Sequence, residues 1–237
     1  MSSQRLPGKP LAEIGGQTLV QRVWQASTKC QELSGSYIAT DSEEIAEHVR
    51  GFGAEVVMTP ASATTGSQRV AMAASSLSIE SVLVVNLQGD MPFINPALID
   101  ATVAMARKHP EYGMITAATP ILDEETYLSN SDVKVVVTDA HQALYFSRAP
   151  IPHSRDESVE VFGYKHFGLY VFRPEALAEY ESAEISGLEE IEKLEQLRLL
   201  EKGVRIGVYL ADPAMTKGSI EVDTPADLAA ANSQVGS

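Results

Sequence analysis

Two aspartates far apart in the chain have the residue type and the setting of ligands for a hard cation. Asp90 follows the apolar run 82–85 in the segment SVLVVNLQGDMP, and Asp223 precedes Pro225 in EVDTPADL. An unbroken apolar run is typical of a strand buried on both faces, and ligands of open α/β sheets bind beyond the carboxyl ends of such strands. Carboxylates there suit Mg²⁺, which takes oxygen ligands and carries phosphates with it. The pair therefore predicts a metal site, although each aspartate alone could be a turn or helix-capping residue.

Two short segments carry residues suited to phosphate or nucleotide binding. Arg5 and Lys9 lie in the glycine-containing loop RLPGK. Arginine presents a planar fork and lysine a point charge, so this loop suits a triphosphate; the alternative is a frayed basic terminus. Ser67 and Arg69 lie in GSQR at a predicted helix start, where N–H groups and the helix dipole favour anions or base carbonyls. The alternative there is that Ser67 only caps the helix.

Alternating strands and helices must position these residues. We expect strands at 37–39, 55–58, 82–85, 114–119, 133–137, 144–147, 167–172 and 204–210. We expect helices at 19–30, from Asp41 to 52–53, at about 70–77, at 96–108, at 188–202 and from Thr224 onward. In the first of these helices Leu19, Val23 and Ala26 share one face. The alternation up to residue 119 predicts right-handed βαβ units and a parallel sheet.

The composition is that of a globular protein and excludes some partners. The chain has 237 residues, of which 44% are hydrophobic and 21% charged, enough for one substantial domain with a full core. Its formal net charge of −14 argues against nucleic-acid or anionic-membrane binding, but a local basic cluster can still hold a phosphate-bearing ligand. Cys30 is the single cysteine, and neither a spanning apolar segment nor a secretory signal is evident, so we expect a cytoplasmic protein.

Several segments in a fixed order carry a family resemblance over nearly the whole chain. They are RLPGKPL at 5–11, ATDSEEIA at 39–46, NLQGDMP at 86–92, VKVV at 133–136, ALYFSRAPIP at 143–152, YKHFGLYVFR at 164–173, LEEIEKLEQLRLLEKG at 188–203 and VDTPADL at 222–228. Together they resemble the bacterial 3-deoxy-manno-octulosonate cytidylyltransferases, or CMP-Kdo synthetases. The resemblance implies an α/β, Rossmann-like nucleotidyltransferase with a mostly parallel central sheet. It implies a single domain, 1–237, in which about 120–175 form a small sugar-binding and dimerisation part.

The resemblance also implies an activity and roles for individual residues. The activity is Mg²⁺-dependent transfer of CMP from CTP to Kdo with release of pyrophosphate, by a homodimer, for lipopolysaccharide biosynthesis. Lys9, Asp90 and Asp223 would be catalytic, and the two aspartates would ligate the metal. The implied nucleotide-binding residues are Arg5, Lys9, Ser67, Arg69 and Gln88. The implied sugar-binding residues are Gln88, Arg148, His166, Tyr170, Glu192 and Gln196.

The chemistry of a carboxylated, hydroxyl-rich sugar agrees with these types. Arg148 and His166 offer positive charge, and Glu192 with Gln196, one turn apart on the predicted helix 188–202, offers hydrogen-bonding groups. Each also has a structural interpretation: Tyr170 as core, His166 as a satisfied buried histidine, and the glutamates as a solvated face.

Two departures from the family pattern leave alternatives open. The family begins with an apolar strand ending in Pro-Ala-Arg, which is missing before Ser2 and which we expect in the middle of the sheet; its loss would leave neighbouring backbone unpaired. Met91 stands where the family usually has glutamate. The chain could therefore be an active enzyme with a longer start, a cytidylyltransferase for an amino-Kdo or another acidic sugar, or an inactive relative that binds nucleotide weakly or pairs with another protein.

Overall fold

The computed structural model describes residues 6–77, 83–155 and 162–236, and the chain divides into two compact units. Unit 1 consists of Met1–Glu80, Leu87–Asp100 and Thr216–Ser237. Unit 2 consists of Ser81–Asn86 and Ala101–Met215.

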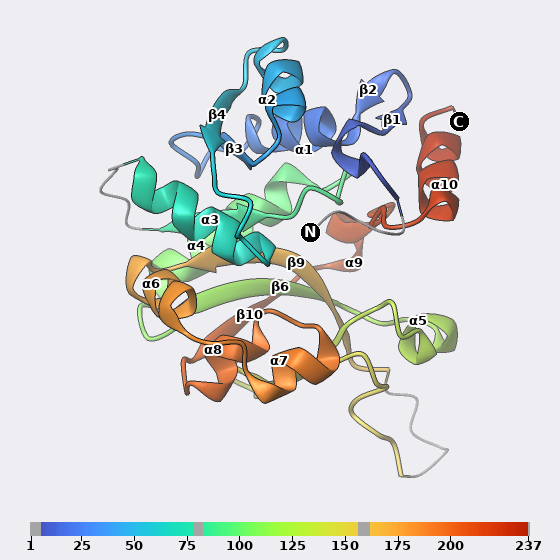
Figure 1. Cartoon of the computed structure of the whole chain (residues 1–237). Helices are drawn as coiled ribbons and strands as arrows, with labels where there is room; N and C mark the ends of the chain where they lie inside the picture. The colour runs from blue at the N-terminus through green and yellow to red at the C-terminus, as the bar shows by residue number, and fades with distance from the viewer. Residues whose placement is uncertain (1–5, 78–82, 156–161, 237) are drawn as a thin grey trace. The chain divides into compact units, whose positions relative to one another are not determined.

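Unit 1 is built around a short parallel strand pair and a set of helices. In chain order it contains η1 (Lys9–Leu11), β1 (Glu13–Ile14), β2 (Gln17–Thr18), α1 (Leu19–Ser27), β3 (Tyr37–Thr40), α2 (Glu43–Arg50), β4 (Glu55–Met58), α3 (Gly66–Ser76) and α10 (Pro225–Val235). β3 runs parallel to β4, with α2 as the crossover beside them (Figure 1), which confirms a βαβ unit. The predicted apolar face of α1 is also confirmed, because Leu19, Val23 and Ala26 are buried.

Two helices of unit 1 begin at residues other than the expected ones. Ser42, and not Asp41, caps α2, and its hydroxyl accepts a hydrogen bond from the N–H of Ile45. α3 begins at Gly66 instead of about residue 70, with Thr65 as the cap. Several neighbouring residues in each segment are chemically able to cap. Contacts elsewhere in the unit decide among them, since Asp41 pairs instead with Arg69.

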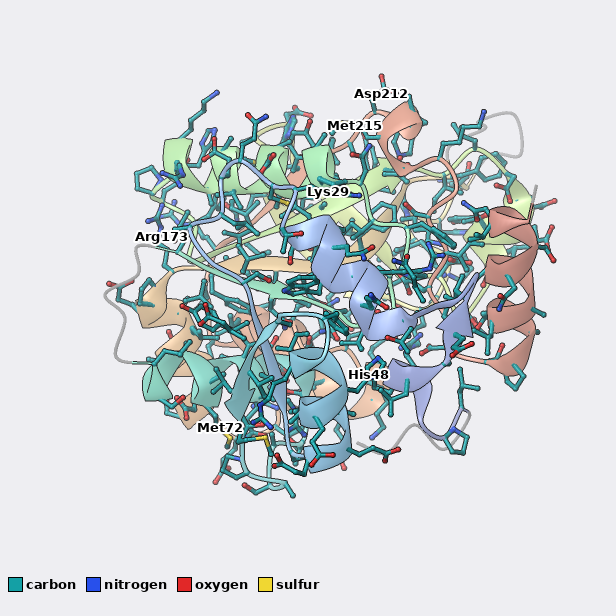
Figure 2. The ribbon with its side chains drawn as sticks, turned by 90° about the horizontal axis from the view of Figure 1, so that it is seen from above. Lys29, His48, Met72, Arg173, Asp212 and Met215 are labelled. Carbon is teal, nitrogen blue, oxygen red and sulfur yellow. The ribbon has the colours of Figure 1, made fainter. Side chains whose placement is uncertain are left out.

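A small apolar core joins three distant segments of unit 1. Ile14, Leu19, Val222 and Ala231 are fully buried. The partly buried side chains that pack against them are Leu6, Phe93, Ile220 and Leu228. Next to this core His48 of α2 (Figure 2) has its Nε2 2.9 Å from the hydroxyl of Thr18. The segments that carry the two aspartates are thereby held against the segment that follows Arg5.

Unit 2 contains a mixed six-stranded sheet. The strand order is β10 (Ile206–Leu210), β6 (Met114–Pro120), β9 (Tyr164–Phe172), β7 (Lys134–Val137) and β8 (Ala143–Ser147), and β5 (Val84–Leu87) also pairs with β9. β10 is parallel to β6, whereas β9 is antiparallel to both β6 and β7, and β7 is antiparallel to β8. The expectation of a mostly parallel sheet is therefore wrong for this unit, because a β7–β8 hairpin and the reversed β9 follow the early βαβ alternation.

β5 is less buried than its sequence indicates. Val82 lies outside the described residues, and the strand runs to Leu87 instead of ending at Val85. Asn86 is buried, while Val84, Val85 and Leu87 are only partly so. Among the described strands β5 pairs with β9 alone, so neighbouring strands cover it incompletely.

The expected helix 188–202 is two helices. The helices assigned mainly to unit 2 are α4 (Pro96–Lys108), α5 (Glu124–Leu128), α6 (Pro174–Ser182), α7 (Gly187–Glu192), α8 (Leu197–Glu201) and α9 (Pro213–Thr216). Lys193 ends α7 in the left-handed conformation, with φ 55°, and α7 and α8 lie next to one another on one side of the sheet (Figure 1). Glu192 and Gln196 are thus not one turn apart on a continuous helix. The turn lets Leu194 and Leu197 reach the core, with 5% and 0% exposure.

Arg173 (Figure 2) caps α6 at its start and anchors it by donating hydrogen bonds to the carbonyls of Tyr112 and Ala106. In the part of the chain that is described, every helix is too short or too polar to cross a bilayer.

Candidate functional site

In unit 1 the side chain of Lys9 brings the two distant aspartates to one point. Its Nζ lies 3.1 Å from Oδ2 of Asp90 and 2.8 Å from Oδ1 of Asp223. The two carboxylate oxygens therefore lie within the sum of these distances of each other, close enough for a single cation to contact both. The side chains are 14%, 27% and 40% exposed, so the cluster is open to ligands from solvent.

Backbone contacts hold this cluster in place. Gly8, with φ 70°, turns the chain into η1, which begins at Lys9. The N–H of Val222 donates to the carbonyl of Asp90 over 2.8 Å, which joins the two aspartate segments directly. Thr224 caps α10, and Asp227 accepts the N–H of Asp223. The carboxylate of Asp223 therefore has no capping role, so the alternative interpretation of this residue is wrong.

The electrostatics of the cluster fit a cation held between two carboxylates. Burial alone would lower the pKa of Lys9, but the charges and hydrogen bonds of Asp90 and Asp223 outweigh it and raise this pKa above its ordinary value. Among the described side chains, one ammonium against two carboxylates makes the cluster acidic. The described residues contain no group of three or more acidic, histidine or cysteine side chains arranged for a metal. Two carboxylates nonetheless suit Mg²⁺, which commonly takes one or two from the protein and fills its shell with waters and phosphate oxygens.

The residues expected to approach a nucleotide lie around the start of α3. A Cβ on Gly66 would come within 2.8 Å of Nε2 of Gln88, so the Gln88 amide lies against the first residue of this helix. Ser67 is 1% exposed. Arg69 donates to the hydroxyl of Thr59 over 2.6 Å and pairs with Asp41 over 3.1 Å. Gln88 precedes Asp90 by two residues, so the short segment that lies against the start of α3 also carries one carboxylate of the cluster.

Unit 2 contains a buried polar cluster on β9, β6 and the start of α8. The hydroxyl of Tyr170 donates to Oε1 of Gln196 over 3.1 Å, and the rings of Tyr170 and His166 are 5.6 Å apart. Gln196 is 2% exposed, and its Nε2 is buried with no hydrogen-bond partner among the described residues. Buried donors in folded proteins are almost always paired, so this amide group has an unused hydrogen bond for a ligand oxygen.

His166 is neutral, which corrects the expectation that it offers positive charge. Complete burial lowers its pKa from 6.5 to about 3. Its Nε2 lies 2.9 Å from the hydroxyl of Thr116, at the register shift between β6 and β9. The same hydroxyl lies 2.8 Å from the carbonyl of Leu169 and so donates there, which assigns the proton to Nε2 of the imidazole.

Arg148 and Glu192 are joined by hydrogen bonds at the end of β8. The carboxylate of Glu192 accepts hydrogen bonds from the hydroxyl of Ser147, over 2.6 Å, and from the N–H of Arg148, over 3.0 Å. The guanidinium of Arg148 donates to the carbonyls of Glu192 and Asn130. Glu192 is therefore neither a solvated surface residue nor a helical neighbour of Gln196.

Sequence reasoning missed Lys134 as part of this arrangement. Its side chain is fully buried, and its Nζ donates to the carbonyls of Ser129, Asp132 and Arg148 over 2.6, 2.5 and 2.6 Å. Burial lowers its pKa. A lysine inside the apolar run VKVV was the available signal, because a buried charge needs dedicated partners.

The predicted residues therefore fall into two groups, one in each unit. Unit 1 holds Lys9, Ser67, Arg69, Gln88, Asp90 and Asp223. Unit 2 holds Arg148, His166, Tyr170, Glu192 and Gln196. Arg5 lies outside the described residues, and Met91 is a core residue with 3% exposure.

A family model and the similar curated proteins agree in describing cytidylyltransferases. A family model described as Cytidylyltransferase matches residues 1–206. A 3-deoxy-manno-octulosonate cytidylyltransferase of Syntrophotalea carbinolica is 43% identical over 235 residues, covering 96% of this chain and 92% of that protein. An 8-amino-3,8-dideoxy-manno-octulosonate cytidylyltransferase of Shewanella piezotolerans is 41% identical over 228 residues, covering 95% and 91%.

Solved structures agree with the sequence relatives. A structure of CMP:2-keto-3-deoxy-manno-octonic acid synthetase complexed with CTP superposes with a TM-score of 0.89 at 32% identity, covering 98% of this chain and 93% of that one. The 4-diphosphocytidyl-2C-methyl-D-erythritol synthase of Anaerococcus prevotii, at 17% identity and a TM-score of 0.62 over 95% and 88% of the two chains, shares the fold alone.

Proposed function

Because the chain belongs to the cytidylyltransferase family, among the 3-deoxy-manno-octulosonate cytidylyltransferases, we propose that it transfers CMP from CTP to Kdo and releases pyrophosphate. The expected family, the α/β nucleotidyltransferase fold and the enzyme class are confirmed by its relatives. The single observation that carries the assignment to this site is the convergence of Asp90 and Asp223 on Lys9.

Asp90 and Asp223 would hold Mg²⁺, and Lys9 would bind phosphate oxygens of CTP. The ion, when bound, neutralises charge on the triphosphate. Lys9 adds a mobile positive charge at the same place, and Ser67 and Arg69 at the start of α3 would orient the rest of the nucleotide. The sugar hydroxyl then attacks the α-phosphorus in line, and pyrophosphate leaves, without a covalent enzyme intermediate.

The acceptor would be held by the polar cluster of unit 2. Nε2 of Gln196 supports this role because it is a buried donor without a partner in the part of the chain that the structure describes. Tyr170 and neutral His166 would complete the hydrogen-bonding set, and Arg148 supplies the positive charge for the carboxylate of the sugar. Glu192 holds the backbone around Arg148 in place. Gln88, which we also expect near the sugar, lies at the start of α3 in unit 1.

The test is pyrophosphate release from CTP, with Kdo and Mg²⁺ present. Asp90→Asn and Asp223→Asn should each lose most activity while remaining folded. Asp212→Asn is the matched control, since the carboxylate of Asp212 (Figure 2) accepts the backbone N–H of Ala214 and belongs to neither predicted site. Failure of the folded protein to release pyrophosphate with any acidic sugar would reject the proposal. Full activity of Asp90→Asn would reject its metal site.

A second acceptor is favoured by the Shewanella relatives, which carry the 8-amino-Kdo name at 41% and 42% identity. Measuring kcat/KM for Kdo and for 8-amino-Kdo on the same preparation separates the two. A higher kcat/KM for 8-amino-Kdo than for Kdo would identify the amino sugar as the acceptor.

We also propose that the chain acts as a twofold homodimer in the cytoplasm, in lipopolysaccharide synthesis. Leu122 and Leu128, the first just before α5 and the second in it, are both exposed and would add apolar surface to an interface between two copies of the chain. Sedimentation should give twice the chain mass of 25.5 kDa. A monomer at micromolar concentration would contradict the dimer.

A further inference from the structure

A fully buried ion pair joins α7 to α8. The guanidinium of Arg198 donates two hydrogen bonds to the carboxylate of Glu189, each of 2.7 Å, and the two residues are only 2% and 5% exposed. The guanidinium also lies 4.2 Å from the ring centroid of Tyr180 and donates to the carbonyls of Tyr180 and Ala183. Every side of the arginine is therefore engaged by α6, α7 or the turn between them.

Stability alone gives little reason for such a pair. Removing two charges from water is costly, and apolar residues of the same size often stabilise a core as well or better. A bidentate Arg–carboxylate pair differs from an apolar contact in one respect: its two parallel hydrogen bonds set the direction between the groups as well as their distance. The pair at Glu189 and Arg198 can therefore set the angle at which α7 meets α8.

The chain between Glu189 and Arg198 carries Glu192, which holds the backbone around Arg148, and Gln196, which belongs to the buried polar cluster of unit 2. Glu192 ends α7, Lys193 turns the chain with φ 55°, and Gln196 caps α8. On one side of the turn Glu192 holds the backbone and hydroxyl groups at the end of β8. On the other side Gln196 accepts the hydroxyl of Tyr170 and keeps its Nε2 unpartnered.

We propose that Glu189 and Arg198 are positioning residues for the acceptor site: their ion pair sets the α7–α8 turn so that Glu192 and Gln196 hold their places at the same time. This inference depends on the proposed function for the identity of the acceptor. Neither residue touches the sugar. The pair acts on sugar binding through Gln196 and Glu192 and leaves the nucleotide residues of unit 1 unchanged.

The decisive variant is Glu189→Met/Arg198→Met, which removes both charges and keeps similar volume. Each single methionine variant should melt well below the wild type, because it leaves one buried charge unpaired. The double variant should regain most of that loss. Its KM for Kdo should nevertheless rise about tenfold, which corresponds to one or two misplaced hydrogen bonds, while its KM for CTP stays within about twofold.

A second variant covers the case in which the double variant melts early. Arg198→Lys keeps the charge but not the planar fork, so it should fold and still raise the KM for Kdo several-fold. The control is Arg50→Met, which breaks the exposed ion pair of Arg50 with Glu43 in unit 1 and should change neither KM.

Two results would overturn the inference: a folded double or Arg198→Lys variant with the wild-type KM for Kdo, or an equal rise in both KM values. A readout without ligand separates this failure from failure of the proposed function. Amide hydrogen exchange at residues 193–197 should quicken in the double variant but not at Asp90 or Asp223. Unchanged amide exchange at residues 193–197 rejects the positioning role even if the wild-type enzyme uses another acceptor.

Discussion

Replacing Lys9 by methionine should change metal affinity and catalysis in opposite directions. Methionine has a similar length but no charge, so Lys9→Met removes the ammonium that contacts both Asp90 and Asp223. In the free protein the ammonium occupies this point, 3.1 and 2.8 Å from the two carboxylates. A divalent ion must therefore displace Lys9 before it can contact both aspartates.

The size of the effect follows from Coulomb's law and from exposure. A unit-charge contact at these distances is worth about 1.4 kcal/mol in water and about 5.5 kcal/mol at an effective dielectric constant near 20. The burial of Lys9 opposes this gain, and Asp223 is 40% exposed to screening solvent, so we take about 1–2 kcal/mol for each contact. Removing the competing ammonium with its two contacts, about 2–4 kcal/mol together, should then tighten divalent-ion binding to the free protein by about 30- to 1,000-fold.

Catalysis should move the other way. Lys9 would neutralise phosphate charge during transfer, and removal of one such group typically lowers kcat by about 10²–10³. The assays are Mn²⁺ binding by electron paramagnetic resonance without nucleotide, and pyrophosphate release with CTP and Kdo. Lys29→Met is the control, because Lys29 (Figure 2) is an exposed lysine just after α1. Unchanged Mn²⁺ affinity in Lys9→Met, or weaker binding, would refute the reasoning, since the carboxylates would then not share the ion.

Three further predictions test other parts of the two sites. His166 has a pKa of about 3 in the folded protein against 6.5 in the unfolded chain, so the unfolded state gains the proton first as pH falls below 6.5. The free energy of unfolding should therefore drop by up to about 1.4 kcal/mol per pH unit towards pH 3. Urea titrations at several pH values should show a shallower drop for His166→Gln than for the wild type. Gln196→Met should change the free energy of unfolding by less than about 1 kcal/mol, because losing the bond from Tyr170 is offset by removing an unpartnered donor, yet raise the KM for Kdo about tenfold; an unchanged KM would exclude Gln196 from the site. Gly66→Ala should push the Gln88 amide aside and raise the KM for CTP several-fold at nearly constant melting temperature, whereas Gly187→Ala, also at the first residue of a helix but in open space, should not.

Local pattern singled out Lys9, Asp90 and Asp223 as candidates, and the family resemblance assigned them to one site. Asp90 follows the β-branched run 82–85 by five residues, Asp223 comes directly before a Thr-Pro helix start, and Lys9 lies in a short glycine loop, so each of these signals depends on nearby residues. Most strands were also predicted to within about two residues of their observed bounds, because apolar runs and the turns between them are short-range features. The capping box at Thr224 belongs to the same class of signal.

Where the local sequence allowed more than one capping residue or helix boundary, tertiary contacts selected one of them. Asp41 and Ser42 can both cap α2, and the pairing of Asp41 with Arg69 leaves that role to Ser42. The helical spacing of apolar residues in 188–202 suits one helix, but the buried pair of Glu189 and Arg198 accompanies a left-handed turn at Lys193.

Charge state and strand direction likewise depended on the folded surroundings. His166 is neutral because the fold buries it, whereas the sequence left a buried histidine and a positively charged sugar ligand as alternatives. β9 is antiparallel to β6, and this direction is fixed by pairing between strands that are distant in the sequence. The sequence alone therefore determined which groups exist and where each short element begins, since those depend on neighbours in the chain. The structure decided which groups meet and how they ionise, because both depend on desolvation and on partners distant in sequence.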